Sequence, residues 1–245
     1  MSLERIQKLL AQSGIASRRK IEHLIKERRI NINNKSVETF GLKVSFKKDN
    51  IQIDNQSINR IHKRYQEKIY LLLNKPEKFL TTTKKNCARR IVTELLPDIK
   101  IERIYPIGRL DYYSEGIILF TNDGFLTNKL IQSRSNVTKI YIVKIKGIPK
   151  KNDLNKLKRG IYLKGGPTGP NNINIIKTTK VNTWLQVILI KGQNQQIRNM
   201  FWRINHPVMR IIRTHFASIS INGLKKGKFR FLTKSEIIKL KKQYY

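Results

Sequence analysis

The sequence GRLDYYSEGIILFTNDG, residues 108–124, determines how the rest of the chain is interpreted. Its apolar middle predicts a short buried strand, and the Asn-Asp-Gly sequence at residues 122–124 predicts the turn that ends this strand. Asp111 is a lone carboxylate that follows Arg109 at the mouth of the preceding turn. Taken alone, such a pair is more often a surface ion pair than a catalytic group. The stretch by itself therefore leaves both roles open for Asp111.

The chain on either side of this stretch predicts an α+β domain. A buried strand at 68–75 precedes it and is stopped by a proline, which lacks the amide that a sheet needs. The elements expected after it are a helix at 125–132, a strand at 139–147, a helix capped by Asp153 and ended by Gly160, a strand at 184–190, a helix at 194–205, strands within 208–221 and a last helix with a capping box at 233–236. Strands and helices mix without strict alternation, which is typical of the α+β class.

The first 60 residues predict a separate small module of two helices and a small sheet. The helices are expected at 3–12 and, capped by Ser17, from there to about residue 29; a hairpin at 29–35 and short strands near Val44 and at 51–53 follow. At ~100° per residue, the second helix has an apolar arc and an adjacent basic arc. The apolar arc holds Ile21, Leu24 and Ile25, and the basic arc holds Arg18, Arg19, Lys26 and Arg29. Charge alone also fits an ordinary solvated helix.

Composition indicates a nucleic-acid partner. Lysine and arginine number 51 against 16 acidic residues, a formal charge of +35, which a phosphate backbone can screen. A membrane surface would also attract this charge, but the sequence has neither a lipidation signal nor an apolar run near the ~18 residues that a spanning helix needs. A single cysteine, Cys87, fits a reducing compartment. We therefore expect a cytoplasmic protein that binds nucleic acid and no membrane.

Neither a metal nor a cofactor is expected. The four histidines are scattered and lack the paired spacing of zinc ligands; they are His23, His62, His206 and His215. The glycine-rich run at 165–169 matches no phosphate-binding loop and predicts a turn.

Two further segments carry residues that could act in catalysis together with Asp111. A Lys-x-Tyr-x-Val sequence begins at Lys139 in a predicted strand, and residues 192–200 carry Arg198 off the apolar face of a predicted helix. Together with residues 108–124, these segments resemble the RNA pseudouridine synthases that act on ribosomal RNA. The group in question comprises enzymes B, E and F of the large subunit, together with enzyme A of the small subunit. The match runs over nearly the whole chain.

The resemblance implies roles for four side chains. Asp111 would be the nucleophile, Tyr141 the active-site tyrosine and Arg198 the basic residue paired with the aspartate, while Arg109 would fill the gap that an extruded base leaves. The residue types suit this chemistry, because carboxylates are ionised at neutral pH, a neighbouring guanidinium offsets desolvation, and a tyrosine can stack on a base and take part in proton transfer. The base must leave the stack because its glycosidic bond is out of reach inside a helix. Rejoining uracil through C5 needs no cofactor.

The N-terminal module resembles the S-four-type RNA-binding domain. The resemblance rests on two helices, the serine-arginine-arginine sequence at 17–19 and the hairpin at 29–35, and it covers about residues 3–60. It implies that the second helix binds RNA backbone. The residues expected to do so are Arg18, Arg19, Lys26 and Arg29.

The chain departs from the family pattern at several positions. Lys78 stands where the family commonly has a glycine, in the turn after a Lys-Pro pair. Three arginines of the family are replaced near the C-terminal helix motif by Gln193, Gln195 and Asn199. These replacements predict a weaker local hold on phosphate, while the chemistry is kept. Lys75, the lysine of the Lys-Pro pair, is interpreted as a strand-end residue outside the catalytic set.

We therefore expect domains at 1–60 and 67–245, joined by a linker at 61–66, in a monomer that isomerises a specific uridine of ribosomal RNA. Residues 75–77 and the long C-terminal half resemble the branch of the group that modifies large-subunit (23S) RNA. Modification of small-subunit (16S) RNA is the alternative within the family. A ribosome-assembly factor that binds RNA without catalysis is a different class, and it would not require the three catalytic residue types.

Overall fold

The computed structural model describes residues 3–58, 67–84, 88–97, 104–132 and 135–244. Contacts divide the chain into two units, one built mainly on the residues up to Ile69 and the other mainly on those from Tyr70 onward. The predicted linker at 61–66 and Cys87 lie outside the described residues.

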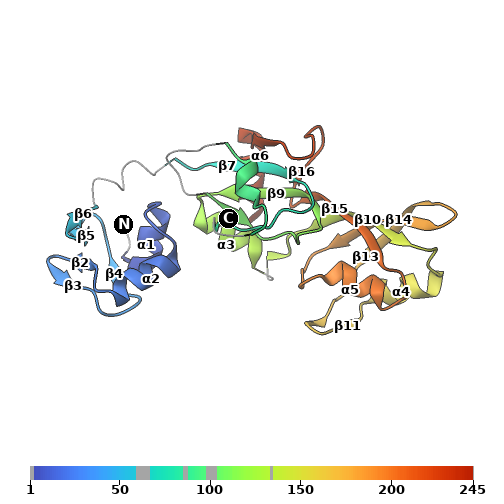
Figure 1. Cartoon of the computed structure of the whole chain (residues 1–245), viewed down its shortest axis with the longest axis horizontal. Coiled ribbons are helices and arrows are strands. Elements are labelled where there is room, and N and C mark those ends of the chain that lie inside the picture. Colours follow the sequence, from blue (N-terminus) through green and yellow to red (C-terminus); the bar gives the residue numbers. More distant parts are fainter. Residues whose placement is uncertain (1–2, 59–66, 85–87, 98–103, 133–134, 245) are drawn as a thin grey trace. The chain divides into compact units, whose positions relative to one another are not determined.

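The N-terminal unit contains two helices and short strands (Figure 1). The helices are α1 (Ile6–Gln12) and α2 (Arg18–Lys26). Over the described residues, one sheet has the order β3-β2-β5-β6 and a second pairs β1 with β4. The strands are β1 (Glu4–Arg5), β2 (Ile30–Ile32), β3 (Lys35–Ser36), β4 (Lys43–Val44), β5 (Ile51–Ile53) and β6 (Gln56–Ser57).

Local sequence explains most of this unit. The Ser17 hydroxyl accepts a hydrogen bond from the backbone amide of Lys20 at 3.1 Å, so the predicted cap of α2 is confirmed. The predicted apolar arc of α2 is buried and packs on α1. The first helix was predicted to begin at residue 3, which was wrong, because Glu4–Arg5 pairs with β4 and α1 begins only at Ile6. Helix α2 also ends earlier than predicted, at Lys26.

The C-terminal unit is built on one mixed sheet. In its described part the strand order is β13-β14-β10-β15-β9-β7-β17, with β16 paired to β15 and β8 to β9. The strands are β7 (Tyr70–Lys75), β8 (Tyr105–Ile107), β9 (Glu115–Thr121), β10 (Lys139–Lys146), β13 (Asn172–Thr178), β14 (Asn182–Leu189), β15 (Val208–Phe216), β16 (Ile219–Ser220) and β17 (Phe229–Phe231). Strands β9 and β15 are parallel neighbours in this otherwise antiparallel sheet.

Helices cover the sheet at two places and create two cores. The helices are α3 (Gly124–Ile131), α4 (Lys151–Arg159), α5 (Gln196–Trp202) and α6 (Lys234–Tyr244), with a 3-10 turn, η2, at Val92–Leu95 and a hairpin of β11 (Tyr162–Leu163) and β12 (Gly166–Pro167). One core joins α4 and α5 to β10, β13, β14 and β15, and Figure 1 shows both helices on the same side of these strands. The other joins α3 and α6 to β7 and β9. The α+β prediction is confirmed.

The ends of the helices test the predicted caps. The capping box of α6 is confirmed, because Thr233 and Glu236 each accept the other's amide, at 3.2 and 2.8 Å. The predicted cap of α4 was wrong: Lys150 is the N-cap residue, and Asp153 lies in the first turn, where its charge still favours the positive end of the helix. The expected end of α4 at Gly160 is confirmed. Helix α5 is shorter than the predicted 194–205.

The parallel joint between β9 and β15 brings the two backbones into close contact. Gly116 has φ +107°, and a Cβ added there would lie 2.1 Å from the Arg213 carbonyl oxygen, so only glycine fits. The Arg213 side chain is 2% exposed and donates to the Ile117 carbonyl from Nε (2.9 Å) and Nη2 (2.6 Å). Glu115 accepts two hydrogen bonds from Arg210, at 2.7 and 3.0 Å. The joint therefore fixes the strand that follows Asp111 against the neighbour of β10.

Candidate active site

A cavity of about 290 Å³ lies beside the β9–β15 joint, within the C-terminal unit. Its lining includes all three predicted catalytic residues, Asp111, Tyr141 and Arg198, together with Arg109. The structure thus brings together residues that lie up to 89 positions apart in sequence (198 − 109). The volume lies just below the range of about 300–1,000 Å³ that is typical of ligand sites, which suits a small ligand such as a single flat ring.

The loop that carries Asp111 is held by its backbone. Gly108 begins it with φ +73°, a conformation that favours glycine. The Thr81 hydroxyl donates to the Leu110 carbonyl at 2.7 Å, and the Ser114 amide donates to the Asp111 carbonyl at 3.0 Å. The half-buried Asp111 side chain therefore projects from a fixed turn into the lining of the cavity.

Lys75, which was predicted to be only a strand-end residue, is a functional candidate in the structure. Its side chain is fully buried at the end of β7, and Nζ donates to four carbonyls, those of Pro76 (2.9 Å), Asp111 (3.2 Å), Tyr112 (3.4 Å) and Ser114 (2.8 Å). Burial lowers the pKa of Lys75 to about 8, while the negative charges of Asp111 and Glu115 act in the opposite direction. The ammonium therefore holds the backbone of the Asp111 loop in place through these hydrogen bonds. A lysine at the end of an otherwise apolar strand was the signal that could have found it.

Tyr141 and Arg213 face each other across β10 and β15, and both line the cavity. Burial lowers the pKa of the Arg213 guanidinium, and its interaction with the Tyr141 hydroxyl opposes that shift. Lys139, two residues before Tyr141, donates from Nζ to the carbonyls of Val137 (2.9 Å) and Ile190 (2.8 Å). Burial and the nearby charge of Arg213 lower the pKa of Lys139 to about 8. The inner wall of the cavity is therefore an aromatic ring flanked by a buried guanidinium, that of Arg213, and a half-buried ammonium, that of Lys139.

Arg198 does not make the contact that the resemblance implies. From α5 its guanidinium donates to the Val208 carbonyl (3.2 Å) and the Tyr113 carbonyl (3.4 Å), and no ion pair with Asp111 is present among the described residues. The expected buried ion pair is corrected accordingly. The reason is that α5 lies beside the start of β15 and the chain after Asp111, where the carbonyls of Val208 and Tyr113 accept the hydrogen bonds of Arg198. Arg198 thus ties α5 to the Asp111 loop.

The departures from the family pattern have local explanations. Lys78 adopts φ +62° and donates its amide to the Tyr112 carbonyl at 2.7 Å, so the turn forms without glycine. Gln193 donates from Nε2 to the Pro167 carbonyl at 3.0 Å and so fastens the hairpin formed by the glycine-rich run. Gln195, at φ +49°, is the N-cap residue of α5.

The basic residues of α2 are placed differently from one another. Arg18, Arg19 and Lys26 are exposed on the helix. Arg29 lies beyond the helix end and donates to both carboxylate oxygens of Asp54, each at 2.6 Å. Its charge is therefore largely balanced within the domain. The other three predicted residues remain exposed on α2, together with Lys20.

The described residues contain no cluster of three histidine, cysteine or acidic side chains that could hold a metal ion. Over the same residues, no helix is long and apolar enough to cross a membrane. What the cavity offers is a carboxylate, a tyrosine ring and several cations. This set can attack an electron-poor carbon while a flat ring stacks on the tyrosine.

Comparison with known proteins gives two family matches. A model described as RNA pseudouridylate synthase matches residues 69–202, and a model of the S4 domain matches residues 4–51. The cavity residues Asp111, Tyr141 and Arg198 all lie within the first match, and α2 lies within the second.

Similar proteins cover almost the whole chain. Ribosomal large subunit pseudouridine synthase B of Bacillus subtilis (strain 168) is 39% identical over 241 residues, which is 98% of this chain and 96% of the relative. The protein of the same name from Buchnera aphidicola is 33% identical over 96% of this chain and 94% of the relative. A crystal structure of a pseudouridylate synthase shares the fold, with a TM-score of 0.69 at 23% identity over 97% of this chain and 99% of that one.

Proposed function

The chain belongs to the RNA pseudouridylate synthase family, and on this basis we propose that it isomerises one uridine of large-subunit (23S) ribosomal RNA to pseudouridine, with Asp111 as the nucleophile. The observation that carries the proposal is the meeting of Asp111 and Tyr141 at one cavity of about 290 Å³. The choice of RNA is supported by the similarity to large-subunit enzymes.

The chemistry follows from the positions of these groups. The target base leaves the RNA stack and enters the cavity, where Tyr141 stacks on it. The Asp111 carboxylate attacks the nucleotide, the N1–C1′ bond breaks, uracil turns, and a C5–C1′ bond forms. The bond between Asp111 and the nucleotide then breaks, which returns the free carboxylate. The C5 proton is lost and N1 gains one, so the reaction is an isomerisation with no net change in electrons. Tyr141 serves in these proton transfers, and Arg109 occupies the gap in the stack.

The cations around the cavity have supporting roles. Arg213 and Lys139 provide a positive potential for charge that develops on the detached uracil. Lys75 holds the nucleophile's loop, and Arg198 holds α5 against it. Arg198 is therefore a positioning residue in this proposal.

The RNA is held mainly by the N-terminal module. We propose domains at 1–60 and 67–245, with Arg18, Arg19 and Lys26 of α2 as contacts to phosphate. These three side chains are exposed, which leaves their charges available to the backbone of the RNA.

Mapping of modified uridines tests the proposal. Unmodified ribosomal RNA of both subunits is incubated with the protein or with Asp111→Asn, treated with carbodiimide, and read by reverse transcription. The expected result is one new stop in large-subunit RNA that the variant does not produce. The variant should still bind RNA within a few-fold of wild type, because the substitution removes a charge and leaves the loop backbone intact.

Other outcomes select the alternatives. A single stop in small-subunit RNA would keep the chemistry and move the substrate. No stop on naked RNA or on assembly intermediates, with binding intact, would favour the non-catalytic assembly factor.

A further inference from the structure

A second hollow, of about 540 Å³, is lined by Tyr112, the residue that follows Asp111. It shares no lining residue with the catalytic cavity. Tyr112 forms one wall, and the turn at 76–79, residues 88–90 and Lys226 form the remainder. None of these residues has a role in the proposed chemistry, so the hollow calls for a separate explanation.

The charge of this hollow favours an anion. Its cationic side chains are Lys78, Arg89, Arg90 and Lys226. The single carboxylate in the lining is that of Glu77, which lies 4.0 Å from the Lys226 ammonium. Lys226 also pairs with Glu115 at 2.8 Å, and Arg90 pairs with Glu94 at 3.4 Å. Among the described residues, Lys78 and Arg89 are therefore the cations of the lining that have no carboxylate partner. The excess of positive charge suits a phosphate group.

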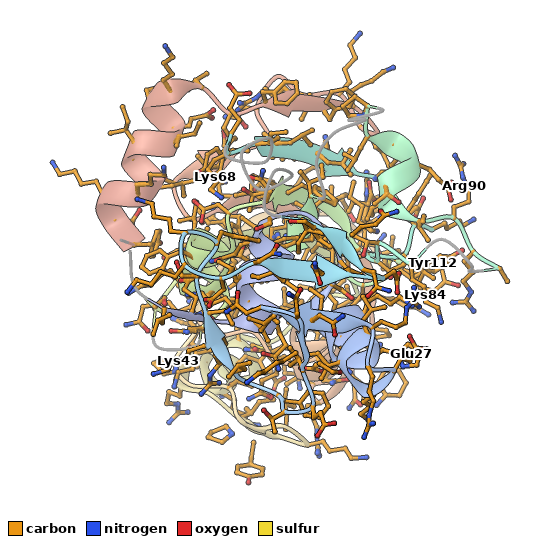
Figure 2. The ribbon with its side chains drawn as sticks, turned by 90° about the vertical axis from the view of Figure 1, so that its left-hand side faces the viewer. Glu27, Lys43, Lys68, Lys84, Arg90 and Tyr112 are labelled. Carbon is orange, nitrogen blue, oxygen red and sulfur yellow. The ribbon has the colours of Figure 1, made fainter. Side chains whose placement is uncertain are left out.

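The hollow is also lined by two guanidinium–ring pairs, in which a flat guanidinium covers an aromatic ring. The Arg89 guanidinium lies over the Tyr112 ring at 4.9 Å, and the Arg90 guanidinium lies over the Phe79 ring at 4.3 Å. Figure 2 labels Arg90 and Tyr112, which both line this hollow. Aromatic rings and guanidinium planes are the surfaces on which unpaired RNA bases stack. Flat surfaces and positive charge together match a nucleotide better than an isolated anion.

One buried ammonium, that of Lys75, forms hydrogen bonds with the backbone beside both cavities. The Lys75 ammonium donates both to the Asp111 carbonyl, beside the catalytic cavity, and to the carbonyls of Pro76 and Tyr112, beside the second hollow. The Lys78 amide also donates to the Tyr112 carbonyl. The nucleophile and the Tyr112 wall are consecutive residues, about 3.8 Å apart at Cα, on a backbone that these bonds fix. A ligand in the hollow is therefore held at a fixed offset from the reacting base.

We propose that the hollow binds the unpaired nucleotide adjacent to the target uridine, with its base stacked on the Arg89–Tyr112 pair and its phosphate paired with Lys78. This rests on the proposed function of the catalytic cavity. The hollow then contributes to the choice of uridine, because a uridine without an unpaired neighbouring nucleotide would gain no stacking interaction there.

A binding experiment tests the hollow without turnover. The probe is a nine-nucleotide single-stranded RNA with a central uridine and 2-aminopurine placed on its 5′ or its 3′ side, and the protein carries Asp111→Asn. Stacking on Tyr112 should quench the fluorescence of one of the two probes. Adding Tyr112→Leu should abolish the quench and weaken binding by roughly 5- to 100-fold, and Tyr112→Phe should restore both, since it keeps the ring.

A matched control separates the hollow from general charge. Arg89→Gln with Arg90→Gln should weaken binding of the quenched probe more than Arg159→Gln with Arg203→Gln, which removes two arginines outside the hollow. Equal losses for the two pairs, or a quench that survives Tyr112→Leu, would overturn the proposal.

An activity measurement distinguishes this proposal from the proposed function. The substrate is an RNA that wild type modifies, with an abasic residue placed at the position whose probe was quenched. This change should raise the KM of wild type by a factor similar to the loss of binding in Tyr112→Leu. It should leave the KM of Tyr112→Leu unchanged. If wild type modifies RNA but is indifferent to the abasic residue, the hollow proposal fails alone. If no RNA is modified but the Tyr112-dependent quench persists, the proposed function fails and the hollow remains a nucleotide site.

Discussion

The position of Asp111 depends on a charge that solvent does not reach. Lys75 is fully buried and donates to four carbonyls around the Asp111 loop, including that of Asp111 itself. An ammonium has three protons, so these acceptors share its donors. A neutral side chain of similar length would fill the space and leave the carbonyls without a donor, which costs free energy in a buried site.

The burial of Lys75 predicts a pH dependence of stability. Its pKa is about 8 in the folded protein against 10.5 as the ordinary value, so between these pH values the unfolded chain binds the extra proton and the folded chain does not. The free energy of unfolding should therefore rise from pH 8 to pH 10.5, by about 1–3 kcal/mol. Urea denaturation across this range should show the rise in wild type and a smaller one in Lys75→Met. Equal slopes would contradict the assignment.

Lys78 predicts a stabilising substitution. The residue adopts φ +62°, which is unfavourable for a side chain with a Cβ. Replacement by glycine should raise the free energy of unfolding by about 0.5–1 kcal/mol after the greater chain entropy of glycine is counted. Lys78→Ala serves as the control, since it removes the charge and keeps the Cβ. A stabilisation as large in Lys78→Ala would mean that charge, and not backbone strain, is responsible.

The joint between β9 and β15 connects the Asp111 loop to the opposite wall of the cavity. Gly116 lies two residues after Ser114 in the Asp111 loop, and its partner in the joint, Arg213, faces Tyr141. A change at the joint should therefore affect both stability and the geometry of the site.

Gly116→Ala measures this coupling. The new Cβ would lie 2.1 Å from the Arg213 carbonyl oxygen, so the strands must separate, and we expect a loss of about 3–5 kcal/mol in the free energy of unfolding. Gly223→Ala is the matched control: its φ is also positive, but nothing lies within 4 Å of the added atom, so it should cost about 1–2 kcal/mol. Losses of similar size in the two variants would show that the close approach is unimportant.

Elements with a strong local signal could be predicted from the sequence, and the others could not. Ser17 and the Thr233 capping box identified two helix starts because those contacts involve residues three apart. The start of α1 was missed because residues 4–5 are drawn into pairing with β4, which lies about 40 residues away. Strand β13 was not predicted, because its polar–apolar alternation covers only residues 172–175 and Ile173 is its one buried residue.

At the scale of the whole molecule, motif order predicted which residues would meet, but not how. Asp111, Tyr141 and Arg198 do line one cavity. The contacts of Arg198 with carbonyls, and the central position of Lys75, depend on where side-chain ends lie after packing. A motif fixes residue types and leaves these distances undetermined.

The charge of the N-terminal module predicts the salt dependence of RNA binding. Arg18→Gln with Lys26→Gln should reduce the slope of log K against log salt by about 0.7–0.9 for each phosphate that is no longer neutralised. Lys47→Gln with Lys48→Gln removes two exposed charges outside α2 and should leave the slope nearly unchanged. Arg29→Gln should also change it little, because Arg29 is already paired with Asp54. Equal slopes for the first two pairs would count against α2 as the RNA contact.

In the proposed mechanism Asp111 converts uridine to pseudouridine, and tritium release is the sharpest test of that role. Formation of the C5–C1′ bond expels the hydrogen on C5, so ribosomal RNA labelled with tritium at C5 of uridine releases one tritium to water for each pseudouridine formed. Wild type should release tritium to a plateau of one per RNA, and Asp111→Asn should release none while binding the same RNA within a few-fold. Release by Asp111→Asn at the wild-type rate would contradict the assignment of Asp111 as the nucleophile.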